Sequence, residues 1–198
     1  MDKAHLVVGL GNPGKDYGRT RHNAGYLAVE RMSERLRVPW TAEARFESLV
    51  SKTEVFGNRL FLCRPTTYMN ESGRAVARIL GYHKIPIEQV LVVVDDADLN
   101  LGSLRMRPGG SSGGHHGLES VEKHLATPDY ARLRLGIGRH DSQRRQITGH
   151  VLGEFAKAEL PVLERMLERA CDQIDCWLQD GLARAMNKFN GAVDLTTQ

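Results

Sequence analysis

The sequence is poor in cysteine and has no long apolar run. Only three of its 198 residues are cysteine, an odd number, so a complete disulfide framework is excluded and we expect reduced, buried thiols. No apolar stretch approaches the roughly 18 residues that span a bilayer, and the first five residues lack the build of a signal peptide. We therefore expect no membrane partner and a cytoplasmic location.

The composition that remains is that of a folded protein, with 41% hydrophobic and 26% charged residues. Apolar runs predict strands at residues 5–10, 48–55, 59–64, 89–95 and 131–138, the last of them half-buried. Helical spacing predicts helices from residue 25 to Pro39, after Asn70, near residues 118–125, and over 160–178. This alternation predicts one α/β domain over residues 1–198, with a mixed, mostly parallel central sheet flanked by helices on both faces.

The charge of the chain is unevenly distributed. The net charge of +3 permits a nucleic-acid partner without requiring one. One region is rich in arginine and is the candidate phosphate-facing side, although a solvated basic face without a partner is the alternative: Arg105, Arg107, Arg132, Arg134, Arg139, Arg144 and Arg145. Residues 139–148 are polar and unpatterned, which predicts a mobile surface loop.

Gly9, Gly11 and Gly14 form a G-x-G-x-x-G pattern after the first predicted strand. In a dinucleotide-binding fold the third glycine lies in the opening turn of a helix, whereas here helical periodicity begins only near residue 25. We therefore interpret this stretch as a loop that lets a substrate approach the backbone. Within it, Asn12 offers both an amide donor and a carbonyl acceptor.

His22 and Asp95 are the candidate catalytic pair. His22 ends the loop after the first strand, and histidine is the commonest general base. Asp95 is the first residue past the most strand-like run, at the edge where open α/β sheets place their sites. Each has a plainer interpretation, a structural histidine and an acid that ends a strand in a polar turn.

The sequence offers no other catalytic apparatus. It has no G-x-S-x-G elbow for a nucleophilic serine and no His-x-Glu or Cys-x-x-Cys spacing for a metal. We therefore expect no metal and no cofactor. What remains is a histidine and an aspartate acting on water, with amides of Asn12 and Asn70 placing the water and polarising a carbonyl, a set that suits hydrolysis of an activated ester.

Six motifs in order resemble those of bacterial peptidyl-tRNA hydrolase. They cover nearly the whole chain: VGLGNPG (8–14), TRHNAG (20–25), RPTTYMNESG (64–73), DDADLNLG (95–102), GGSSGGHHGL (109–118) and RLRLGIG (132–138). The resemblance implies a monomeric, metal-independent esterase that cuts the bond between a peptide and the 3′-terminal ribose of tRNA, with no DNA partner.

The resemblance also implies roles for individual residues. His22 falls on the general base and Asp95 on the carboxylate that orients it. Asn12 falls on the position that distinguishes a blocked from a free aminoacyl group, and Asn70 on the one that positions substrate and water. Tyr17 and Tyr68 match family positions that contact the substrate near the tRNA 3′ end. Arg107 and Arg134 match basic positions that meet tRNA phosphates.

One position departs from the family pattern. His116 stands where the family usually has asparagine, and an imidazole cannot offer the donor and acceptor pair of one amide in the same geometry. Two alternatives of other classes stay open. One is an RNA-binding protein on the same fold without hydrolase activity, and the other is a hydrolase of small esters, which would show no tRNA dependence.

Overall fold

The computed structural model describes residues 3–138 and 147–194. Within them the chain forms an eight-stranded sheet. Its strands are β1 (Ala4–Gly9), β2 (Thr41–Glu43), β3 (Ser48–Val55), β4 (Asn58–Pro65), β5 (Val90–Asp96), β6 (Ser103–Arg107), β7 (Ala131–Gly136) and β8 (Gly191–Ala192). The α-helices are α1 (Ala24–Leu36), α2 (Ser72–His83), α3 (His116–Leu125), α4 (Ile147–Val151), α5 (Leu160–Asp180) and α6 (Leu182–Phe189).

The sheet is mixed, as predicted, in the order β2-β3-β4-β1-β5-β7-β6-β8. The four central strands, β4, β1, β5 and β7, pair in parallel. The strands at both edges pair antiparallel, so the parallel character expected for most of the sheet is confined to its centre. Because β1 and β5 are parallel neighbours, the loops that follow them open at the same edge, which brings residues 10–23 and 95–102 together.

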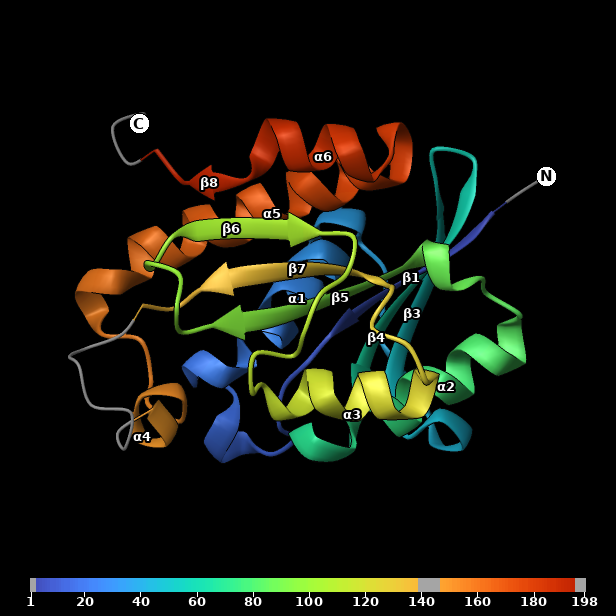
Figure 1. Cartoon of the computed structure of the whole chain (residues 1–198), viewed down its shortest axis with the longest axis horizontal. Helices are drawn as coiled ribbons and strands as arrows, with labels where there is room; N and C mark the ends of the chain where they lie inside the picture. Colours follow the sequence, from blue (N-terminus) through green and yellow to red (C-terminus); the bar gives the residue numbers. More distant parts are fainter. Residues whose placement is uncertain (1–2, 139–146, 195–198) are drawn as a thin grey trace.

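Helices cover both faces of the sheet, which confirms the predicted arrangement (Figure 1). Alternate side chains of β1 point to opposite faces, so Val7 packs with α1, α5 and α6 while Leu6 and Val8 pack with α2 and α3. Both core clusters are apolar, and this explains why the central strands are nearly continuous hydrophobic runs. The three cysteines are free and buried, as expected.

Two glycines allow α1 to lie directly on β1. A Cβ at Gly9 would stand 2.2 Å from the carbonyl oxygen of Gly25, and a Cβ at Gly25 would stand 2.3 Å from that of Val93. Both are closer than any side chain tolerates. The first glycine of the G-x-G-x-x-G pattern therefore serves helix-to-strand packing, and this close approach fixes the start of α1 just after His22.

Several local predictions need correction. Strand β7 is buried on both faces, and Arg132, at 0% exposure, is enclosed with its guanidinium on Glu122 and on the carbonyls of Ser111 and Pro128. It therefore cannot face a phosphate. Strand β6 and helix α6 were not anticipated. Of the predicted loop 139–148, residues 139–146 lie outside the described residues and the last two begin α4.

No helix in the described ranges combines the length and the apolar character that a membrane span requires.

Candidate active site

A cleft of about 690 Å³ opens where β1 and β5 end. It collects most of the residues that the sequence singled out, although they come from five separate parts of the chain. Its lining includes Asn12, His22, Tyr68, Met69, Asn70, Asp95, His115, His116, Arg134, Val151 and Leu152.

His22 and Asp95 meet in this cleft as predicted. His22 lies in a short 3₁₀ turn, η2 (Arg21–Asn23), and its Nδ1 stands 2.9 Å from Oδ1 and 3.0 Å from Oδ2 of Asp95. The Asp95 side chain is 3% exposed and that of His22 is 14% exposed. The contact uses Nδ1, so the other ring nitrogen, Nε2, is the one that can accept a proton in the cleft.

A third residue, His115, completes the cluster, and no motif in the sequence pointed to it as a partner of His22 and Asp95. Its Nε2 lies 2.9 Å from Oδ1 of Asp95. Its Nδ1 accepts the backbone N–H groups of Gly117 at 3.1 Å and Leu118 at 3.4 Å, so His115 is the N-cap of α3. A nitrogen that accepts two N–H groups carries no proton, and Nε2 must therefore donate to Asp95.

Asp95 is thus an acceptor for two imidazole N–H groups. Burial would by itself raise the pKa of Asp95, but the contacts with His115 and His22 outweigh it and lower the pKa to about 2. The carboxylate remains ionised at neutral pH and holds His22 in the tautomer with its proton on Nδ1. The ligand atoms of these three residues lie within 4.8 Å of one another, as a metal site would require. These atoms already hydrogen-bond one another, because Asp95 accepts from His22 Nδ1 and from His115 Nε2.

Asn12 is fixed in one orientation beside this pair. Its side-chain Oδ1 accepts the Met69 N–H at 2.9 Å, and its backbone N and O bond the Asn23 amide at 2.8 and 3.0 Å. The carbonyl acceptor that the sequence offered to a substrate is therefore occupied by Met69. The NH₂ end of the Asn12 amide is the donor available to a carbonyl in the cleft.

Asn70 and Tyr68 line the same cleft from a second 3₁₀ turn, η4 (Met69–Glu71), and the residue before it. Tyr68 is 62% exposed, so its ring forms a wall at the rim. Tyr17 is different. It is half-buried, and among the described residues it is not part of the cleft lining.

A second, smaller pocket of about 430 Å³ adjoins the cleft and is basic. It is lined by Asp96, Arg105, Arg107, Pro108, Gly109, Gly110, Ser111 and Arg134. Arg134 and Asp96 line both pockets and are joined at 3.2 Å. The predicted phosphate-facing arginines divide accordingly. Arg105, Arg107 and Arg134 face this pocket, Arg132 is buried, and Arg139, Arg144 and Arg145 lie outside the described residues.

Comparisons with known proteins agree with this geometry. The family model of peptidyl-tRNA hydrolase matches residues 6–197. The chain belongs to the peptidyl-tRNA hydrolase family.

Individual family members are similar over most of their length. A peptidyl-tRNA hydrolase of Synechococcus sp. (strain JA-2-3B'a(2-13)) is 46% identical over 93% of this chain and 82% of its own. One from Listeria welshimeri is 40% identical over 93% and 99%. The crystal structure of peptidyl-tRNA hydrolase from Acinetobacter baumannii superposes with a TM-score of 0.90 at 34% identity, covering 97% of both chains.

Within this peptidyl-tRNA hydrolase fold, the two neighbouring histidines have different surroundings. His115 is turned to Asp95, whereas the His116 side chain is 74% exposed and its Nδ1 lies 3.1 Å from Oε2 of Glu119 on the same helix. His116 lies at the edge of the cleft, and the hydrogen bond that its imidazole makes is with Glu119 and not with His22 or Asp95.

We expect His116→Asn to keep or raise the hydrolysis rate. The exposed imidazole makes a surface contact with Glu119, and asparagine supplies the amide that the family resemblance leads us to expect at this position. The measurement is kcat and KM for an N-blocked aminoacyl-tRNA, with a thermal melt to check folding. A loss of more than about tenfold, which is 1.4 kcal/mol of transition-state binding, would show that this histidine has a role of its own.

Proposed function

We propose that His22 is the general base and Asp95 its orienting carboxylate in hydrolysis of the ester that joins a peptide to the 3′-terminal ribose of tRNA. As a member of its family, this chain is a hydrolase of peptidyl-tRNA. The observation that carries the assignment of roles is the placement of His22 Nδ1 against both oxygens of a buried Asp95 at 2.9 and 3.0 Å.

The proposed reaction needs one water and one ester. His22 Nε2 takes a proton from the water as its oxygen attacks the ester carbonyl carbon, and the resulting imidazolium is stabilised by ionised Asp95. The oxyanion that develops is met by the Asn12 NH₂ group and by Asn70. When the intermediate collapses, the C–O bond to the ribose breaks and His22 returns its proton to the 3′ oxygen.

The substrate would lie across both pockets. The lining of the cleft includes the apolar residues Met69, Val151 and Leu152, which suits peptide side chains. The basic pocket with Arg107 and Arg134 suits phosphates of the tRNA, which would position it without reading its sequence. His116 and Tyr68 at the rim, and Tyr17 beside the loop of Asn12, remain proposed substrate contacts.

The remaining proposals concern the protein as a whole. We propose one domain over residues 1–198, since one sheet runs through the described residues, and a monomer, as the family resemblance implies. We also propose a cytoplasmic location and no DNA partner, because the proposed substrate is peptidyl-tRNA. The reaction as written needs neither a metal nor a cofactor.

A comparison of two esters tests the proposed substrate class. We expect the enzyme to cut an N-acetylaminoacyl-tRNA with a KM that rises with salt, because phosphate contacts release counterions. A simple aryl ester such as p-nitrophenyl acetate should be cut at no more than a trace rate. Comparable turnover of the aryl ester, insensitive to salt, would instead support a hydrolase of small esters.

Arg107→Gln is expected to weaken tRNA binding without slowing chemistry. Removal of one phosphate contact should raise KM several-fold, leave kcat unchanged and reduce the slope of log K against log salt by about 1. The measurement is KM for an N-blocked aminoacyl-tRNA over a series of salt concentrations. Arg59→Gln, at an exposed position on β4, is the matched control and should leave the slope unaltered. An unchanged slope in Arg107→Gln would remove this arginine from the interface.

A further inference from the structure

The turn that carries His22 is anchored through both of its neighbours. On one side, the Asn23 amide bonds the backbone N and O of Asn12 at 2.8 and 3.0 Å. On the other, the Arg21 N–H donates to the carbonyl of Gly153 at 2.9 Å, and its guanidinium forms a two-pronged contact with Glu159 at 3.2 and 2.8 Å. Glu159 ends a 3₁₀ turn, η7 (Lys157–Glu159), that leads directly into α5.

The pair of Arg21 with Glu159 is partly enclosed and closely fitted. The side chains are 7% and 20% exposed, and the guanidinium lies over the Phe155 ring with its carbon 4.9 Å from the ring centre. Glu159 also accepts the Ala156 N–H at 2.6 Å. A planar guanidinium matches a carboxylate at two points, which a lysine ammonium cannot do. The ion pair therefore fixes the position of Arg21 in addition to attracting its charge.

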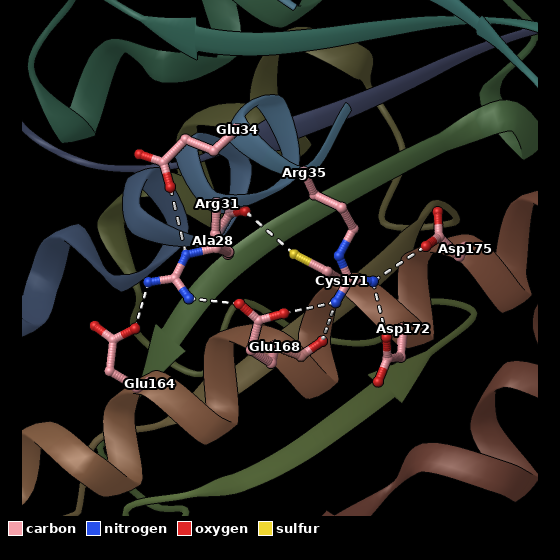
Figure 2. Close-up of polar contacts among 9 residues, drawn as sticks. All are labelled: Ala28, Arg31, Glu34, Arg35, Glu164, Glu168, Cys171, Asp172 and Asp175. Carbon is pink, nitrogen blue, oxygen red and sulfur yellow. Dashed lines mark hydrogen bonds and ion pairs between the residues drawn. The ribbon is translucent and has the colours of Figure 1, made fainter. Parts of the chain in front are cut away.

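The same two segments are joined further along by exposed ion pairs. Figure 2 shows that Arg31 and Arg35 of α1 contact four acidic residues of α5: Glu164, Glu168, Asp172 and Asp175. Their arginine side chains are 25% and 29% exposed, and Glu164 is 55% exposed. Solvent screens such contacts, so they hold α1 to α5 without a strict geometry. Arg21–Glu159 is the more buried contact and lies next to the proposed general base.

We infer that Arg21 is a positioning residue for His22, acting through its two-pronged ion pair with Glu159. The inference rests on the proposed function, since it concerns the base of that reaction. His22 must keep Nδ1 within 3.0 Å of Asp95 while Nε2 reaches the water. Arg21 affects the position of His22 through the backbone of the turn that the two residues share. When Glu159 loses its charge, the two-pronged contact with the guanidinium weakens, and the N–H bond from Arg21 to the Gly153 carbonyl is left to hold this side of the turn, so the position of the Arg21 backbone is less closely fixed. Misplacement of a catalytic group by about 1 Å can cost 10²-fold in rate.

The test compares Glu159→Gln with Glu164→Gln, a matched removal of one carboxylate charge on the same side of the same interface. We expect Glu159→Gln to lower kcat roughly tenfold with KM within about twofold, because Arg21 is not among the residues described as lining the cleft. Glu164→Gln should leave both within about twofold. Arg21→Lys, which keeps the charge and loses the two-pronged contact, is the second variant if Glu159→Gln does not fold, and we expect the same direction of change.

A proton NMR signal provides a readout that a purely structural role would not move. The Nδ1–H of His22 in its bond to Asp95 should give a low-field resonance, identified by its loss in His22→Ala. We expect this resonance to shift or broaden in Glu159→Gln and to stay in place in Glu164→Gln. Unchanged kcat and resonance in Glu159→Gln, or equal losses in both variants, would overturn the inference. A wild type that cuts no ester would refute the proposed function instead, and the resonance would still report on positioning.

Discussion

Replacing His22 with alanine is expected to lower kcat for an N-blocked aminoacyl-tRNA by a factor of about 10² to 10⁴, the usual contribution of a general base. KM should change little, because the arginines proposed to bind tRNA phosphates line the adjoining pocket, whose lining does not include His22. Residual hydrolysis would come from substrate positioning by Asn12 and Asn70. The measurement is single-turnover hydrolysis with enzyme in excess, which separates chemistry from product release.

A thermal melt and tRNA binding are the controls for His22→Ala. His22 is 14% exposed, and its ring contacts Asp95 and the neighbouring His115 ring at the cleft, so the variant should fold and bind tRNA as the wild type does. A variant that folds, binds and retains the wild-type rate would remove His22 from the mechanism and leave the cluster without a base.

Asp95→Asn is expected to cause a loss of about 10² or more in kcat while the cleft keeps its shape. His115 must donate from Nε2, since its Nδ1 accepts two backbone N–H groups, so the amide oxygen of the new residue is drawn to the Oδ1 position. The amide nitrogen then lies beside His22 Nδ1 and donates to it. This favours the tautomer protonated on Nε2, which cannot accept a proton from water.

A double variant shows whether the two residues act as a unit. Because Asp95 works through His22, adding Asp95→Asn to His22→Ala should lower the rate little further, whereas independent contributions would multiply. With a pKa of about 2, Asp95 stays ionised down to about pH 3, so a fall of kcat/KM above that pH does not arise from protonation of this carboxylate. A multiplied loss in the double variant would contradict the paired roles.

The pairing of His22 with Asp95 could be predicted because it follows from topology. His22 ends the loop that follows β1, and Asp95 lies at the carboxyl end of β5, the parallel neighbour of β1. A buried apolar run is the clearest strand signal in a sequence. The roles of the asparagines and arginines could not be predicted from topology. Only the family resemblance implied them, because an amide or a guanidinium on a loop carries no periodic signal.

The role of His115 could not be predicted from its neighbours in sequence. Which of two adjacent histidines turns inward depends on the path of the glycines before them, and Gly113 and Gly114 take φ values of 63° and 81°. The one available signal was its place just before a predicted helix, where a side-chain acceptor caps the first N–H groups. Arg132 was misassigned for a related reason. Its alternation with leucines is typical of a half-exposed strand, and its burial is made possible by the carbonyls of Ser111 and Pro128 and by the Glu122 carboxylate.

The most direct test of the central claim is hydrolysis by the wild type, in EDTA, of an N-blocked aminoacyl-tRNA beside the same aminoacyl-tRNA with a free amine. Activation of water by His22 and Asp95, with Asn12 as the donor that meets the substrate, predicts that the blocked ester is cut, that the free one is spared and that EDTA has no effect. An enzyme that binds tRNA but cuts neither ester, or that loses activity in EDTA, would contradict it.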